Sequence, residues 1–170
     1  MEQRGRILVV ESKRSYLAVL ARRLTEAGYR VAAADSAASA IAELHRTPID
    51  LVLAELNLPV TSGAELARVI RSQVQWNDVP VMLITGRSQP SGAVRAYEAG
   101  ADDVILKPFH FEVLFARIER RLAWAQSFKR LRGDNAVLDA RVVERAIQMG
   151  ELKDQLMARE AELTRLRRIT

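Results

Sequence analysis

Cysteine is absent from this sequence of 170 residues. The chain therefore has neither the disulfide framework of a small secreted domain nor a thiolate ligand for a metal, and thiol redox chemistry is excluded. Aromatic residues are also scarce, at 5% of the chain, which leaves few rings that could stack on nucleic-acid bases. These shortages point away from disulfide-stabilised proteins, from metal sites with thiolate ligands and from nucleic-acid-binding proteins.

Long hydrophobic runs are missing as well. The first ten residues, MEQRGRILVV, are followed by Glu11 and contain only four consecutive apolar residues, too few for the core of a signal peptide or a membrane span. We therefore expect a cytoplasmic location and no membrane partner. The net charge of +5 arises after residue 112, but acids are interspersed with those arginines, which favours a solvated helix surface over a nucleic-acid interface.

Short apolar runs alternate with segments of helical periodicity over the first two thirds of the chain. The apolar runs are residues 7–10, 31–34, 50–54, 80–85 and 103–107. Apolar residues recur every three or four positions near residues 16–24, 37–44, 63–71 and 93–99, and from Phe111 onward. Short apolar strands separated by single helices indicate a parallel sheet covered on both faces. We therefore predict a doubly wound α/β fold with a five-stranded parallel sheet.

In such a sheet, the functional crevice lies beyond the carboxyl ends of the strands. Polar side chains occur at four of the five predicted strand ends. They are Glu11 with Ser12, Glu55, Thr85 and Lys107.

The sequence around these strand ends resembles the response-regulator receiver family over roughly residues 5–122. The matching stretches are ILVVES, EAGYRV, DLVLAELNLPVTSG, VPVMLITG and YEAGADDVILKPF. The resemblance implies a flavodoxin-like receiver fold and a role in two-component signalling. Family members place an acidic pair after strand 1, a phosphoacceptor aspartate after strand 3, a threonine or serine after strand 4, and a lysine before a proline after strand 5. The corresponding residues here are Glu11 with Ser12, Glu55, Thr85, and Lys107 before Pro108.

Two of these positions depart from the family. Glu55 replaces the phosphoacceptor aspartate, and its extra methylene displaces the carboxylate by about an ångström, which for an in-line displacement lowers the rate on the order of 100-fold. Ser12 replaces a carboxylate that binds the cation in the family, and magnesium relies on such oxygens. We therefore predict no catalytic residue, no cofactor, and a magnesium site that is lost or weak.

Glu11 and Glu55 remain as a carboxylate pair that could hold a cation weakly or share a proton. The alternative is that Lys107 pairs with Glu55 and closes the pocket. Glu55 could also place its charge as a phosphorylated aspartate would, drawing Thr85 and Lys107 toward it. Against this, Val104 stands where receivers often carry the aromatic residue that is coupled to the threonine. Both a locked scaffold and a mimic of the activated state stay open, with the locked scaffold favoured.

Beyond Leu122 there is no second α/β pattern, and no proline follows Pro108. We therefore expect a receiver domain at residues 1–122 and a long helix at 123–170, either continuous with the receiver's last helix or broken near Gly133. Steps of four and three from Trp124 define a seam of 13 positions, ten of them apolar. The seam comprises Trp124, Phe128, Leu131, Asn135, Leu138, Val142, Arg145, Met149, Leu152, Leu156, Arg159, Leu163 and Leu166.

A seam sustained over about six heptads is typical of a coiled coil. We therefore predict a homodimer through this helix, with the parallel or antiparallel orientation left open. The expected function is that of a non-catalytic pseudo-receiver, which binds an unidentified signalling protein and dimerises through the seam.

Two other functions stay open. The chain could be the N-terminal regulatory part of a larger signalling enzyme, such as a diguanylate cyclase, an HD-type phosphodiesterase or a histidine kinase, because the ending LTRLRRIT has no helix-stop signal before Thr170. The stretches VVERA and QLMAR also resemble pieces of an RNA-binding antitermination module, although its spacing is not kept.

Overall fold

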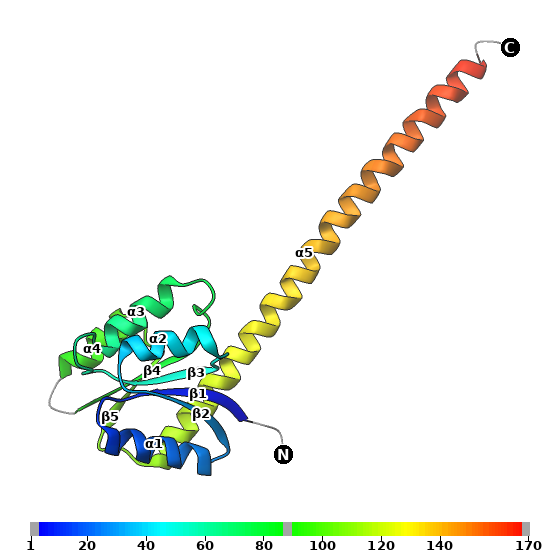
Figure 1. The fold of residues 1–170 in the computed structure, drawn as a ribbon. Coiled ribbons are helices and arrows are strands. Elements are labelled where there is room, and N and C mark those ends of the chain that lie inside the picture. Colours follow the sequence, from blue (N-terminus) through cyan, green and yellow to red (C-terminus); the bar gives the residue numbers. More distant parts are fainter. Residues whose placement is uncertain (1–3, 87–89, 168–170) are drawn as a thin grey trace. The chain divides into compact units, whose positions relative to one another are not determined.

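The structure is a computed structural model that describes residues 4–86 and 90–167. Five parallel strands form one sheet in the order β2-β1-β3-β4-β5 (Figure 1). The strands are β1 (Arg4–Val10), β2 (Tyr29–Ala34), β3 (Leu51–Glu55), β4 (Val81–Gly86) and β5 (Asp103–Lys107). The predicted doubly wound sheet is therefore confirmed, although β1 begins three residues before its apolar run.

Helices cover both faces of the sheet (Figure 1). They are α1 (Arg14–Glu26), α2 (Ala37–Arg46), α3 (Gly63–Ser72), α4 (Pro90–Glu98) and α5 (Phe111–Arg167). Leu8 and Val10 of β1 pack in one core cluster with α2, α3 and α4, whereas Ile7 and Val9 pack in a second cluster with α1 and the start of α5. Because alternate strand residues face opposite sides, a strand buried on both faces must be apolar throughout, as β1 is.

Two of the helices begin with reciprocal side-chain caps. Ser36 starts α2, with Ser39 as its partner, and Ser62 starts α3, with Glu65 as its partner. In each case the cap side chain accepts a hydrogen bond from a backbone N–H in the first turn, and the partner side chain accepts one from the cap residue. These caps fix where α2 and α3 begin after β2 and β3.

Tyr16 departs from the pattern predicted for the first helix. Its spacing with Leu20 and Leu24 placed it on the buried face, but its side chain is half exposed while those two leucines are buried. Tyr16 lies in the first turn of α1, next to the carboxyl edge of the sheet. Its ring therefore borders the strand ends rather than the core.

Contacts divide the chain into two units, Met1–Ser127 and Phe128–Thr170. The second unit is the helical continuation of α5, which is unbroken at Gly133. Its apolar seam residues from Leu131 to Leu163 are exposed in the single chain. The side chain of Leu166, the last seam position, lies outside the described part, as does Thr170. In residues 4–86 and 90–167, no helix is both long and apolar enough to cross a bilayer.

Candidate functional site

Four of the residues singled out from the sequence stand at the carboxyl edge of the sheet. Glu11 directly follows β1, Glu55 ends β3, Thr85 is the second-last residue of β4, and Lys107 ends β5. In the sheet, β1 neighbours β3, and β4 lies between β3 and β5. This order brings side chains from three separate strand ends within reach of one another.

Lys107 forms ion pairs with both glutamates. Its Nζ lies 2.5 Å from Oε2 of Glu55 and 3.5 Å from Oε2 of Glu11. The side chains of Glu11 and Glu55 are 3% and 11% exposed, and that of Lys107 is 28% exposed. Two poorly hydrated carboxylates therefore share one ammonium group, and the three side chains together carry one net negative charge. We call Glu11, Glu55 and Lys107 the charged trio.

The remaining oxygens of the two carboxylates are held by the backbone. The N–H of Lys13 donates to Oε1 of Glu11 at 2.9 Å, and the N–H of Asn57 donates to Oε1 of Glu55 at 3.3 Å. The ring of Tyr16 adds a third contact to the cation, with its centroid 4.8 Å from Nζ of Lys107. A cation over an aromatic face is attracted by the ring quadrupole, so Tyr16 helps to keep Lys107 in place.

The electrostatics of the trio favour a charged lysine. Burial lowers the pKa of Lys107, but the hydrogen bond that Lys107 donates to Glu55 and the charges of Glu55 and Glu11 outweigh burial. The pKa of Lys107 is therefore raised above its ordinary value. Lys107 stays an ammonium ion throughout the physiological pH range.

Thr85 and Val104 lie close by in the fold but do not take part in the trio. The hydroxyl of Thr85 is buried and has no hydrogen-bond partner among the described residues. Val104 is packed in the core cluster shared with α2, α3 and α4. Ser12 is partly exposed and follows Glu11 in the loop to α1. The structure thus joins three of the six singled-out residues in one network.

Gly63 is a residue of this site that the sequence did not reveal. A Cβ added at Gly63 would lie 2.3 Å from the carbonyl oxygen of Glu55 and 3.0 Å from Cα of Leu56. The N–H of Gly63 also donates to the carbonyl oxygen of Leu56 at 2.8 Å. The start of α3 therefore packs directly on the backbone that carries Glu55, which only a residue without a side chain permits.

The donor set does not fit the magnesium ion that the family resemblance implies. Mg²⁺ needs carboxylate oxygens in octahedral geometry, but here the ammonium of Lys107 already contacts both glutamates. Ser12 offers a hydroxyl where the family has a carboxylate. Within the described ranges, no group of three or more acidic or histidine side chains is arranged to hold a metal.

An apolar hollow of about 430 Å³ borders the trio. Its lining joins α1 to the loop between β5 and α5, and consists of Tyr16, Val19, Leu20, Lys107, Pro108, Phe109 and Phe111. Tyr16 and Val19 are 50% and 43% exposed. Apolar surface of this kind next to a charged cluster is typical of sites that bind proteins.

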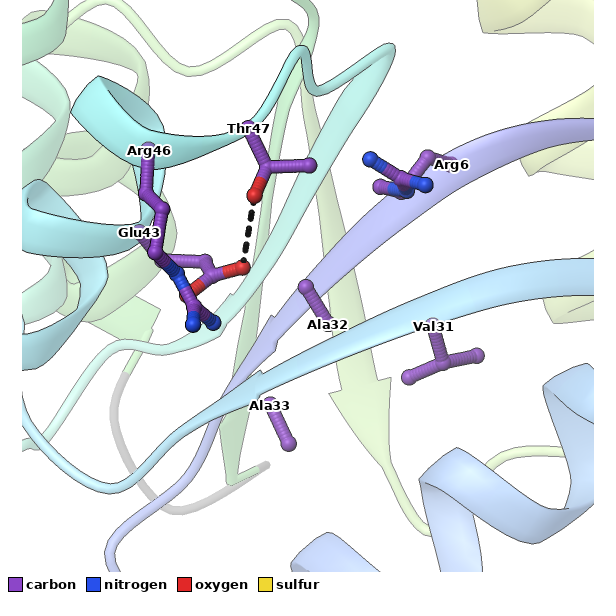
Figure 2. A pocket seen from close by; sticks show the side chains of 7 residues that line it. All are labelled: Arg6, Val31, Ala32, Ala33, Glu43, Arg46 and Thr47. Atoms are coloured by element: carbon purple, nitrogen blue, oxygen red, sulfur yellow. Dashed lines mark hydrogen bonds and ion pairs between the residues drawn. The ribbon is translucent and has the colours of Figure 1, made fainter.

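A second hollow, of about 540 Å³, lies beside β2 and α2 (Figure 2). Its polar groups satisfy one another: Arg46 donates to Glu43, and the hydroxyl of Thr47 donates to Glu43 at 3.1 Å. The hydrogen bond from Arg46 lowers the pKa of Glu43, which burial alone would raise. Arg6 also lines this hollow (Figure 2). It belongs to the start of β1, whereas the trio lies at the carboxyl ends of the strands.

Two known proteins are similar in sequence to most of this chain. A probable cyclic di-GMP phosphodiesterase from Vibrio cholerae is 30% identical over 161 residues, covering 95% of this chain and 36% of its own length. The transcriptional regulatory protein PrrA from Mycobacterium tuberculosis is 32% identical over 158 residues, covering 93% of this chain and 62% of its own length. The chain thus spans less than two thirds of either relative.

Solved structures show the same fold. The receiver domain of the sensor histidine kinase PA1611 from Pseudomonas aeruginosa superimposes with a TM-score of 0.66 at 28% identity, covering 70% of this chain and 98% of that domain. That structure holds a magnesium ion coordinated in its active-site cleft. Residues 7–119 match the response regulator receiver domain. Because this match covers most of the chain and includes all three members of the charged trio, the protein belongs to the response-regulator receiver family.

Proposed function

We propose that this receiver does not take up a phosphoryl group at Glu55 and acts in signal transduction as a protein-interaction and self-association module. The observation that carries the proposal is the 2.5 Å contact between Lys107 and Glu55. Oε2 of Glu55 is paired with the ammonium of Lys107 and Oε1 accepts a hydrogen bond from the N–H of Asn57, so both oxygens are engaged and less nucleophilic. Nucleophilic attack also requires in-line placement, which the longer glutamate side chain alters.

The poor fit of the donor set around Glu11 and Glu55 to a magnesium ion supports the same proposal. The receiver of PA1611 coordinates magnesium in its cleft, and a divalent cation there neutralises the charge of a transferring phosphoryl group. In this chain, a magnesium ion would have to displace Lys107 from Glu11 and Glu55, and Ser12 adds no charge. We propose no catalytic role for any residue of the receiver.

Within this proposal, a locked scaffold is favoured over a mimic of the activated state. A mimic would draw both Lys107 and Thr85 toward Glu55. Lys107 is paired with Glu55, but the hydroxyl of Thr85 accepts no hydrogen bond and donates none among the described residues. Val104 further leaves the site without the aromatic residue expected for a conventional switch.

The Glu55→Gln variant separates the two forms. If the domain is locked, we expect the backbone of β4 and α4 to stay unchanged, because glutamine keeps the length of the side chain and the acceptor for Asn57. Backbone amide chemical shifts measured by NMR provide the test. Glu119→Gln, which removes an exposed ion pair with Arg4, is the control. Shift changes that spread from Thr85 through α4 in Glu55→Gln alone would instead favour the mimic.

Self-association is proposed through the seam of α5. Leu138, Val142, Met149, Leu152 and Leu156 are each at least 55% exposed in the single chain. Apolar side chains repeated at seven-residue spacing bury this surface when a second helix pairs with the first. The partner that we propose is therefore a second copy of the chain, with the apolar hollow near Tyr16 left for a different signalling protein.

Truncating one seam residue should weaken this association. Leu156→Ala removes two buried leucines per pair, at about 1.5 kcal/mol each, and should raise the dissociation constant roughly 100-fold. Met157→Ala is the control, because Met157 is equally exposed (61%, against 58% for Leu156) but lies off the seam. Sedimentation equilibrium of the full chain measures both. Equal association of the two variants would contradict pairing through the seam.

A second candidate function is the regulatory segment of a larger signalling enzyme. The specific support is the Vibrio cholerae relative, a probable cyclic di-GMP phosphodiesterase. Its similarity extends over 161 residues, which is longer than the unit Met1–Ser127 and so includes part of the long helix. The test is the reading frame that follows the codon of Thr170, in which a catalytic domain would support this candidate.

A further inference from the structure

Strand β2 forms one edge of the sheet and pairs on one side only, with β1. The backbone of Ala34 faces β1, because its carbonyl oxygen accepts a hydrogen bond from the N–H of Glu11 at 3.0 Å. Successive residues of a strand direct their backbone groups to opposite sides, so those of Val31 and Ala33 point away from β1. In residues 4–86 and 90–167, no hydrogen bond outside the sheet uses these groups. We call this side of β2 the free edge.

Two arginines lie side by side near the start of β1 and β2. Arg6 and Arg30 are Cα partners in the parallel register. Both side chains point to the face that α2 covers, because Leu8 and Ala32, two residues further along each strand, pack in the core cluster on that face. Among the described residues, neither guanidinium has an acidic ion-pair partner. Like charges on adjacent strands repel, so this pair leaves positive charge unmatched beside the free edge.

The hollow of about 540 Å³ beside β2 and α2 adjoins both features (Figure 2). Residues 31–33 of the edge strand line it, together with Arg6. Glu43 is the one acid of its lining, and Arg46 and Thr47 already donate hydrogen bonds to that carboxylate. Asp50 bonds to the backbone of Arg6 from the other side of β1, next to β3. The space beside the free edge therefore carries an excess of positive charge.

These features decide what kind of molecule the free edge can hold. Both N–H and C=O groups point outward along β2, and another peptide backbone supplies the matching acceptors and donors at strand spacing. A nucleic acid backbone brings acceptors alone, which the outward carbonyl oxygens repel. A second copy of β2 brings the same excess of arginine, and its charge opposes self-pairing. An extended peptide with acidic side chains satisfies both the backbone groups and the arginines.

We propose that the free edge binds an extended acidic segment of a partner protein as a sixth strand of the sheet. The backbone of this segment pairs with Val31 and Ala33. Acidic side chains at alternate positions share one face of the added strand and contact Arg6 and Arg30. This partner surface is separate from the hollow near Tyr16 and from the seam of α5, and the proposal depends on neither.

Titration of the full chain with a synthetic peptide tests the proposal. The probe is GVEVEVG, blocked at both ends, in which the valines favour an extended backbone and the two glutamates share one face. Backbone amide NMR should show the largest shift changes at Val31 and Ala33, together with slower exchange of their N–H hydrogens. The blocked peptide GVKVKVG has the same length and pattern with the opposite charge. It should bind at least about 10-fold more weakly.

Two variants separate the role of charge from that of the backbone. Arg6→Gln/Arg30→Gln should raise the dissociation constant of GVEVEVG about 10-fold, because two ion pairs are lost. The control Arg68→Gln/Arg120→Gln removes the same charge from exposed positions of α3 and α5 and should leave binding unchanged. Ala33→Pro removes one outward N–H but none of the hydrogen bonds to β1, which an edge strand tolerates. It should weaken binding while the circular dichroism spectrum is maintained.

Several results would overturn the proposal. Equal binding of GVEVEVG and GVKVKVG would show that the arginines select nothing, and a wild-type chain that binds neither peptide would show that the edge takes no strand. Shift changes at Val31 and Ala33 that grow with protein concentration in the absence of peptide would assign the edge to a second copy of the chain. The same shift changes on addition of an RNA oligonucleotide would assign it to a nucleic acid.

Discussion

Lys107→Met should lower the free energy of unfolding of the receiver by about 3 kcal/mol, a shift in melting temperature on the order of 10 °C. Methionine keeps the length of the side chain but removes the charge. Glu11 and Glu55, 3% and 11% exposed, would then face each other without a cation. Leaving a buried charge unpaired is far more destabilising than removing both members of a pair.

The double variant Lys107→Met/Glu55→Gln tests whether the unpaired carboxylates cause this loss of stability. Because the glutamine removes one of the two unpaired carboxylates, the double variant should be more stable than Lys107→Met alone. Lys153→Met, at an exposed position of α5, controls for loss of a lysine charge. Urea unfolding followed by circular dichroism measures all three variants. Equal midpoints for Lys107→Met and Lys153→Met would show that the trio adds nothing to stability.

The raised pKa of Lys107 gives this contribution a defined pH range. A group whose pKa is higher in the folded state stabilises the fold fully below its unfolded pKa, about 10.4 for lysine. The stability difference between wild type and Lys107→Met should therefore hold from neutral pH to about pH 10. It should shrink as the pH rises further and Lys107 loses its proton in the folded protein.

Gly63→Ala should destabilise the receiver by about 3 kcal/mol. The added Cβ would lie 2.3 Å from the carbonyl oxygen of Glu55, and a backbone oxygen cannot rotate away as a flexible side chain can. The start of α3 must therefore move, which also breaks the 2.8 Å hydrogen bond from Gly63 to the carbonyl of Leu56. The strain therefore falls on the backbone of Glu55, a member of the charged trio.

Gly133→Ala is the control for this substitution. An added Cβ at Gly133 meets nothing within 4 Å, and alanine favours a helix interior over glycine by about 1 kcal/mol. The same exchange should thus be neutral or stabilising in α5 and strongly destabilising at the start of α3. Thermal unfolding by calorimetry measures both, and a Gly63→Ala protein as stable as wild type would refute the close packing on Glu55.

The sheet could be predicted from the sequence because its cause is local. Apolar runs such as ILVV and the intervening helical periodicity are set by residues a few positions apart, and a sheet buried on both faces demands them. The placing of Glu11, Glu55 and Lys107 at one edge followed from strand polarity alone. Their identity as one ion-paired cluster was left open, because Lys107 lies 52 residues from Glu55 and 96 residues from Glu11 in the sequence.

Other features had no local signal. The contact of Tyr16 with Lys107 joins α1 to the end of β5, and helical spacing had assigned Tyr16 to the core. Arg71 pairs with Asp102 at 2.6 Å across 31 residues of sequence, which no periodicity reveals. Val60, fully exposed with a φ of 67°, shows a strained loop after β3 where a β-branched residue gave no hint of one.

In the long helix, by contrast, a local sequence signal exists but the structure does not follow it. Gly133, Asp134 and Asn135 form a poor helix stretch by propensity, yet α5 continues through them, because propensity is a weak determinant over three residues. The seam follows from spacing alone.

The central claim, that Glu55 is held by Lys107 and accepts no phosphoryl group, is tested most directly by intact-mass spectrometry after incubation with a small-molecule phosphodonor and magnesium. We expect the wild-type mass to stay unchanged. The Ser12→Asp/Glu55→Asp variant, which restores both family carboxylates, serves as the comparison and should gain the mass of one phosphoryl group. A wild-type chain that acquires an acyl-phosphate mapped to Glu55 would contradict the account.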